Sequence, residues 1–219
     1  IKDGYYFSVI PWVKEFLVTQ NKIIDQRTDQ LIDKMLYYTG LKPFEVFPDA
    51  ILARSQSAHI KYILAKRSIA KRDYKKALKL LNSIPSSHLS YPFVSHLKGV
   101  AFSLLGNQVE ARNQFNDCMR SSLKTKNKML SPIIQNQLEL NSQYCLVGKA
   151  RSYFGERNFR QTELSYIDIP KDSFVWPQIL IEEAWNSYYQ KNYNRTLGKL
   201  VSYQAPIFEI ILIQVIKKE

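Results

Sequence analysis

The chain contains three histidines, His59, His88 and His96, which are its first candidates for metal-ligating or acid–base chemistry. None of them belongs to a motif with ligand spacing, such as two histidines four residues apart on one helix. The glycine-rich phosphate-binding loops and the nucleophile motif of serine hydrolases are also missing from the sequence. We therefore predict hydrogen-bonded or solvated histidines, no metal site, no bound cofactor and no enzyme activity.

Two cysteines, Cys118 and Cys145, are the other chemically reactive groups. They form neither a closely spaced pair nor part of a zinc motif. Both fall at inward-facing positions of predicted helices, where a thiol behaves as a small hydrophobic side chain. The pattern favours two buried thiols, with a disulfide between them as the alternative.

A concentration of positive charge lies at residues 61–79, which hold eight cations and a single acid. Tyr74, Ala77 and Leu81 are spaced as the buried stripe of a helix, so the cations beside them occupy its outer face. We call this the basic face, and its members are Lys71, Arg72, Lys75, Lys76 and Lys79. A solvated surface is the favoured interpretation, and a surface that binds nucleic acid or anionic lipid is the alternative.

The composition limits the class of protein. Hydrophobic residues make up 45% of the 219 residues, and there are only 7 Gly and 9 Pro, which excludes disordered, collagen-like and disulfide-stapled miniature proteins. The net charge of +12 admits acidic partners without selecting one. No run of eighteen apolar residues occurs, so we predict no membrane span.

The elements that position these residues repeat along the chain. Ala77 and Ala111 lie 34 residues apart in similar surroundings, and so do Thr162 and Thr196. Between the two pairs the offset is 51 residues, an excess of 17 that falls at residues 120–143. We expect this excess to lengthen two helices or to add a loop near residues 124–132.

A small residue stands twelve positions before each of these residues, and the four are Ala65, Gly99, Ala150 and Ala184. Two antiparallel helices approach closely only where both present small side chains. Between each pair of small residues stands a Gly, Asn or Asp, where one helix ends and the next is capped. The repeating unit is therefore predicted to be a helix hairpin.

These segments resemble tetratricopeptide repeats, whose 34-residue unit has small residues at its eighth and twentieth positions. The resemblance covers about residues 58–206. It implies an all-α fold, a right-handed superhelical solenoid of helix hairpins. It also implies a scaffold that binds a peptide or partner protein in a concave groove.

The first helix of each tetratricopeptide unit lines that groove, so the resemblance assigns groove positions here. They are His59, Tyr62, Lys66, Phe93, His96, Tyr144, Arg151, Phe154, Gln178, Trp185 and Tyr189. Aromatic side chains give large contact area at low entropic cost, and cations pair with carboxylates, so this mixture is typical of an interface. For Trp185 and Tyr188 a place in the core is an equal alternative.

Two amphipathic helices are predicted before the repeats, at residues 5–18 and 23–38, with Gly40 ending the second. Residues 43–49 are expected to form a loop, and residues 50–70 one long helix. We therefore divide the chain into an N-terminal cap at 1–52, four helix hairpins at 53–208, and a C-terminal tail or the start of a further element at 209–219.

The last unit, residues 176–208, is similar to a segment of uncharacterised tetratricopeptide-type proteins of the bacterial cell envelope, notably in delta-proteobacteria. This resemblance implies a periplasmic or envelope location in a bacterium, with a cytoplasmic location as the alternative. The chain begins at Ile1, so we expect that a leader, a tag or another domain has been removed or lies outside the given sequence.

Overall fold

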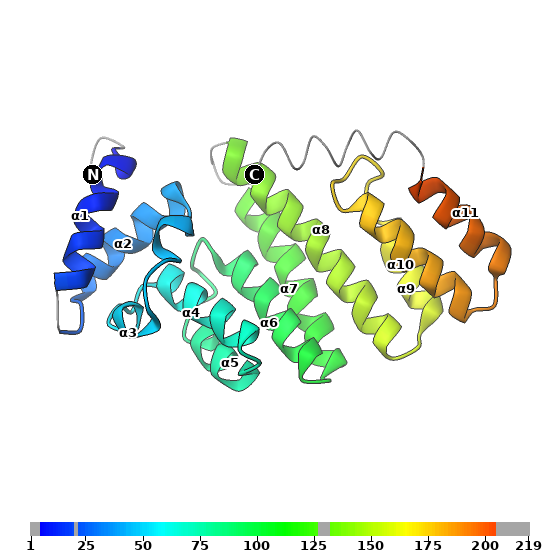
Figure 1. The fold of residues 1–219 in the computed structure, drawn as a ribbon, viewed down its shortest axis with the longest axis horizontal. Coiled ribbons are helices and arrows are strands. Elements are labelled where there is room, and N and C mark those ends of the chain that lie inside the picture. Colours follow the sequence, from blue (N-terminus) through cyan, green and yellow to red (C-terminus); the bar gives the residue numbers. More distant parts are fainter. Residues whose placement is uncertain (1–4, 20–21, 127–131, 205–219) are drawn as a thin grey trace. The chain divides into compact units, whose positions relative to one another are not determined.

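The computed structural model describes residues 5–19, 22–126 and 132–204, and every regular element in these ranges is a helix (Figure 1). The fold is therefore all-α, as predicted. The chain divides into two compact units, Ile1–Ala101 and Phe102–Glu219. Each unit is described by itself below. The predicted tail at 209–219 lies outside the described residues.

Unit 1 begins with the two predicted helices. Its elements are α1 (Tyr6–Thr19), α2 (Gln26–Thr39), the short 3-10 helix η1 (Lys42–Phe44), α3 (Asp49–Leu52), α4 (Ala58–Ala70), α5 (Tyr74–Asn82) and the greater part of α6 (Tyr91–Leu104). The Asp25 carboxylate caps α2 by accepting from the backbone of Arg27 and Thr28. Gly40 ends α2 with a φ of +80°, a conformation that favours glycine.

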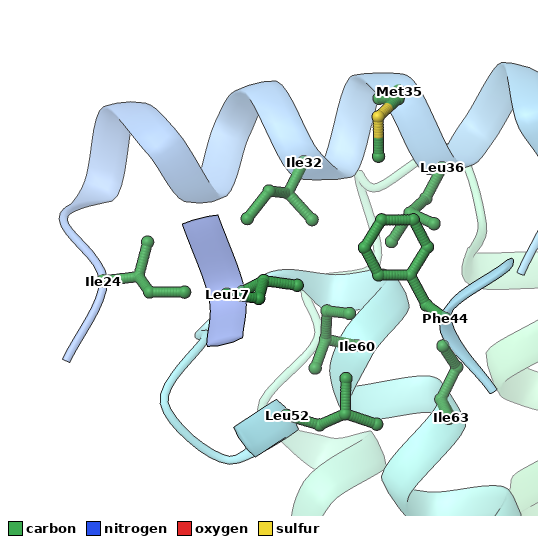
Figure 2. Packing of buried hydrophobic residues seen from close by; sticks show 9 residues of the cluster. All are labelled: Leu17, Ile24, Ile32, Met35, Leu36, Phe44, Leu52, Ile60 and Ile63. Atoms are coloured by element: carbon green, nitrogen blue, oxygen red, sulfur yellow. The ribbon is translucent and has the colours of Figure 1, made fainter. Parts of the chain in front are cut away.

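The first core of unit 1 gathers apolar side chains from α1, α2, η1, α3 and α4, as Figure 2 shows. Its buried members are Leu17, Ile24, Ile32, Met35, Leu36, Phe44, Leu52, Ile60 and Ile63. Because Ile60 and Ile63 belong to α4, the N-terminal helices cover one side of that helix. The N-terminal segment therefore packs against the first helix of the first hairpin.

The expectation of one long helix at residues 50–70 is wrong, because the chain turns between α3 and α4. Ser57 caps α4 by accepting from the Ile60 amide. Ser55 and Ser57 also donate to two carboxylates of α2, Asp29 and Asp33, at 2.5 and 2.6 Å. These side chains compete with the helical backbone for hydrogen bonds, which is why serines favour caps and turns over helix interiors. The expected loop at 43–49 is also partly helical, since η1 places the Phe44 ring in the core.

Unit 2 consists of α7 (Gln108–Lys126), α8 (Pro132–Gly155), α9 (Phe159–Ile167), α10 (Trp176–Tyr189) and α11 (Tyr193–Tyr203), preceded by the end of α6. α7 has 19 residues and α8 has 24, whereas α9 and α10 have 9 and 14. The excess of 17 residues therefore lengthens two helices. The expected loop near 124–132 falls mostly outside the described residues.

The prediction of two free thiols is wrong. Cys118 on α7 and Cys145 on α8 form a disulfide, with their Cα atoms 6.4 Å apart. Both residues are fully buried, as the sequence indicates. The two lengthened helices pack along each other, and this brings together thiols that are 27 residues apart in the chain. Sequence spacing did not indicate this register.

The four hairpin turns have one backbone design. A residue with positive φ occurs in each turn, at 34-residue spacing within each pair: Arg72, Gly106, Arg157 and Lys191, with φ between 58° and 81°. An Asp or Asn follows directly, and its side chain accepts from the amide three residues later in all four turns. This side chain caps the second helix of the hairpin. The predicted turns between successive helices are thus confirmed.

The small residues occupy buried positions, as the crossing argument requires. Ala65 and Ala77 belong to one buried cluster of α4, α5 and α6. Thr196 on α11 donates to the Ala184 carbonyl of α10 at 3.4 Å. Gly99 and Ala150 are also buried. In the α4–α5 and α10–α11 hairpins, small side chains therefore let the paired helices approach closely.

Among the described helices, none has the length and apolar character needed to cross a bilayer.

Candidate functional site

Six aromatic rings form a continuous network on unit 2, which we call the aromatic patch. Its members come from α8, α9, α10 and α11 and are Phe154, Phe159, Trp185, Tyr188, Tyr189 and Tyr193. Each ring lies 5.6 to 6.3 Å from at least one other ring, centroid to centroid. These separations are within the range of attractive aromatic contacts.

The repeat positions the patch. Phe154 and Phe159 flank the turn between α8 and α9, and their rings meet edge-on at 5.8 Å and 62°. Tyr188 and Tyr193 flank the next hairpin turn and meet with the same distance and angle. Tyr189 joins the two pairs, because its ring stacks on Phe159 at 5.8 Å and 7°. The patch is therefore built at the turn end of two successive hairpins.

The patch is open to solvent on α10. Trp185 and Tyr189 are 55% and 56% exposed, and Tyr188 is exposed as well. The core alternative for Trp185 and Tyr188 is thus wrong, because α11 packs on α10 without covering these rings. Large apolar rings gathered at the surface are typical of interaction sites.

An ion pair borders the patch. Arg151 on α8 donates from Nε to the Glu182 carboxylate of α10 at 3.0 and 3.1 Å, and Tyr166 donates to the same carboxylate at 2.6 Å. The hydrogen bonds from Arg151 to Glu182 raise the pKa of Arg151, and burial followed by the Glu182 charge raises the pKa of Tyr166. Arg151 and Glu182 lie one helical turn before Phe154 and Trp185. Arg151, a predicted groove residue, therefore links α8 and α10, two of the four helices that carry the patch.

Two other groove positions of unit 2 lie apart from the patch along their helices. Tyr144 precedes Phe154 by ten residues on α8, which is ~15 Å along the helix. Gln178 lies near the start of α10, and both side chains are exposed. Phe154, Trp185 and Tyr189 are thus the predicted groove residues that the structure joins in one surface.

The groove positions of α4 do not form one open surface. His59 is buried, and Tyr62 packs against the buried cluster of α4, α5 and α6 that contains Ala65 and Ala77. Burial, followed by the charge of Glu45, raises the pKa of Tyr62 to about 12. Lys66 is exposed and pairs with Glu45 at 2.9 Å. On α6, Phe93 and His96 are half-buried.

The basic face is exposed, as predicted. Lys75, Lys76 and Lys79 lie at the surface of α5, and Arg72 lies in the preceding turn. Lys71 is held by Asp49 at 2.7 Å, and hydrogen bonds from Lys71 and Arg67 lower the pKa of that carboxyl. The aromatic side chains nearest in sequence, Tyr62 and Tyr74, are not exposed.

A cluster that sequence reasoning missed lies in unit 1, where Asp33 contacts two histidines. His59 Nδ1 and His88 Nε2 each lie 2.7 Å from a different oxygen of the Asp33 carboxylate. Asp33 also accepts from Ser57 Oγ and the His59 amide. Burial opposes ionisation, but the hydrogen bonds from His59, His88 and Ser57 outweigh it and hold the pKa of Asp33 far below its usual range. The three residues are widely separated in the sequence, so spacing could not identify them.

No model of a known protein family matches the chain, and no curated protein matches it.

Proposed function

We propose that the chain is a non-catalytic scaffold of tetratricopeptide type that binds a peptide segment of a partner protein on the aromatic patch. The observation that carries this proposal is the network of six rings held at the ends of two hairpins. The 34-residue spacing of the turns and the buried small residues support the repeat assignment. A right-handed superhelical array is the arrangement that we propose for these hairpins.

The patch has the properties of a peptide-binding surface. Its rings already contact one another, so little side-chain entropy is lost when a partner covers them. Binding hot spots are enriched in Trp and Tyr. The three exposed members of the patch that lie on α10 are all of these types. The proposed partner segment therefore inserts apolar or aromatic side chains among Trp185, Tyr188 and Tyr189.

The charges near the patch favour an acidic partner. Arg157 and Lys191 occupy the two hairpin turns whose flanking residues form the patch, and Arg160 follows on α9. All three are exposed. Glu156, beside them, is already paired with Arg112 at 2.7 Å. A segment that carries acidic residues next to its apolar ones matches this pattern, since cations and carboxylates orient each other across an interface.

The experiment selects peptides from a random library on the purified protein and measures their affinity for variants. We expect the selected peptides to combine aromatic or aliphatic residues with Asp or Glu. Trp185→Ala and Tyr189→Ala should each weaken binding by about tenfold or more. Phe174→Ala is the matched control, because Phe174 is equally exposed on unit 2 and lies outside the patch. Equal affinity for the patch variants and the control would reject the proposal.

The basic face supports a second candidate function, binding of nucleic acid or anionic membrane. Lys75, Lys76 and Lys79 are exposed and have no ion pair among the described residues. If each of the three lysines contacts one phosphate of duplex DNA, the slope of log affinity against log salt concentration should be about −2.7. Charge reversal at the three lysines should abolish this binding, and binding that is insensitive to salt would exclude it.

We also propose an extracytoplasmic location, as the resemblance to envelope proteins implies. A disulfide that joins α7 to α8 suits an oxidising compartment, because cytoplasmic thiols are kept reduced in most organisms. Because both sulfurs are buried, the test precipitates intact cells with acid, unfolds the protein without reductant and then alkylates any free thiols. Unmodified Cys118 and Cys145 are expected, whereas alkylation of both would place the protein in a reducing compartment.

A further inference from the structure

The Asp33–His59–His88 cluster brings together ligand atoms suited to a metal ion. One oxygen of Asp33 and one ring nitrogen from each histidine all lie within 4.8 Å of one another. Two imidazoles and a carboxylate are the ligand types that bind Zn²⁺ and neighbouring transition metals. We propose that these three residues bind one divalent transition-metal ion of the Zn²⁺ class.

Three separate elements hold the ligands in place. Asp33 lies on α2 and His59 in the first turn of α4, where the His59 amide donates to the Asp33 carboxylate at 2.9 Å. His88 lies in the segment between α5 and α6, and its Nδ1 is 2.6 Å from Ser90 Oγ. Metal-binding histidines use their second nitrogen in this way, which fixes the orientation of the ring. The ligands are therefore positioned before any ion arrives.

In the structure, protons shared between the two histidines and Asp33 occupy the place of the metal ion. Each 2.7 Å contact needs one proton between an imidazole nitrogen and an Asp33 oxygen. When a cation binds, that proton leaves or moves to the other ring nitrogen, and the nitrogen lone pair turns to the ion. At present His88 Nδ1 accepts from the Ser90 amide at 3.2 Å, so on metal binding this contact is lost and Nδ1 donates to Ser90 Oγ instead.

The cluster is reachable from solvent. A cavity of about 530 Å³ in unit 1 is lined by Asp33 and His88 together with Asp29, Gln30 and Lys61. His59 closes the inner side of the cluster, where the Tyr37 ring lies edge-on to it at 6.2 Å. An ion with three protein ligands keeps a coordination position for water or another small ligand, and the cavity leaves room for it.

The test measures Zn²⁺ binding to tag-free protein treated with a chelator, by calorimetry, with Co²⁺ absorption in the visible range as a second readout. We expect one equivalent of Zn²⁺ and a Co²⁺ spectrum with nitrogen and oxygen ligands but no thiolate band, because both cysteines are in the disulfide. His88→Gln keeps a polar side chain beside Asp33 and should weaken binding by at least about tenfold. His96→Gln is the matched control, since His96 is the remaining histidine of the chain.

A measurement on the unaltered protein covers the case in which His88→Gln does not fold. Zn²⁺ titration followed by NMR of the imidazole resonances should shift the signals of His59 and His88 together and leave that of His96 in place. Failure to bind a stoichiometric equivalent, equal affinity in His88→Gln and His96→Gln, or a shift of His96 alone would overturn the proposal.

Discussion

The disulfide between α7 and α8 gives a stability prediction with a calculable size. Reduction removes the cross-link and leaves nearly all the atoms of the native state in place. For a closed loop with a sequence separation of 27 residues, the chain-entropy relation predicts a loss of about 3.5 kcal/mol at 25 °C. We therefore expect the free energy of unfolding of unit 2 to fall by about this amount when Cys118 and Cys145 are reduced.

The assay is urea unfolding of the oxidised protein against protein reduced in denaturant and refolded with reductant. Tryptophan fluorescence reports on unit 2 when the exposed Trp12 of unit 1 is replaced by Phe, because Trp176 and Trp185 both belong to unit 2. At an ordinary dependence on urea, the midpoint should fall by at least about 1 M. Cys118→Ala with Cys145→Ala serves as the control that cannot reoxidise.

Two results would refute this reasoning. Two thiols that react in the unfolded, unreduced protein would show that the disulfide does not form. Equal midpoints for the oxidised and reduced forms would show that the cross-link does not restrict the unfolded chain. The alanine control should unfold with the reduced form or below it, because the buried sulfurs and the contact from Asn141 Nδ2 to Cys118 are also lost.

Four further substitutions test single positions of the fold. Gly148→Ala places a methyl group 2.5 Å from the Phe115 ring and should cost about 1–3 kcal/mol in urea unfolding, whereas Gly198→Ala meets nothing within 4 Å and should stabilise α11. Gly106→Ala puts a side chain at a φ of +81° and should lower the free energy of unfolding by about 1–2 kcal/mol, which a fall in the thermal midpoint would report. The pKa of Asp33 is lowered in the folded state, so its stabilisation is present above the unfolded pKa of about 4 and is lost as pH falls below it. Stability of Asp33→Asn, measured by urea unfolding from pH 7 to pH 3, should therefore be lower at neutral pH and less dependent on pH.

Local spacing predicted the helices and their turns, because these features depend on residues near one another in the chain. The pattern of small residues predicted the buried positions of Ala65 and Ala184, and the turn residues predicted the hairpins. The break before α4 was missed, since Ser57 meets Asp33 across 24 residues of intervening sequence. The disulfide was missed for the same reason, because the register of α7 against α8 depends on packing.

The candidate sites show the same division between local and distant information. Trp185 and Tyr188 on α10 were predicted as groove or core with equal weight, and the decision depends on how far α11 covers α10. The histidine cluster requires α2, α4 and the segment before α6 to meet, which no periodicity encodes. Residues that act together across elements are therefore the part of a site that a single sequence hides.

The repeat also explains why the aromatic patch is confined to the last two hairpins. The positions that hold Phe154 and Phe159, or Tyr188 and Tyr193, flank every hairpin turn. In the second hairpin these positions hold Ser103 and Gln108, which hydrogen-bond to each other instead, and in the first they hold Ile69 and Tyr74. The backbone at the four turns is alike, so the fold does not require aromatic rings at this place. The aromatic rings at equivalent positions of two neighbouring hairpins, joined by Tyr189, are consequently an addition to the repeat, and the proposed binding of a partner peptide gives them a role.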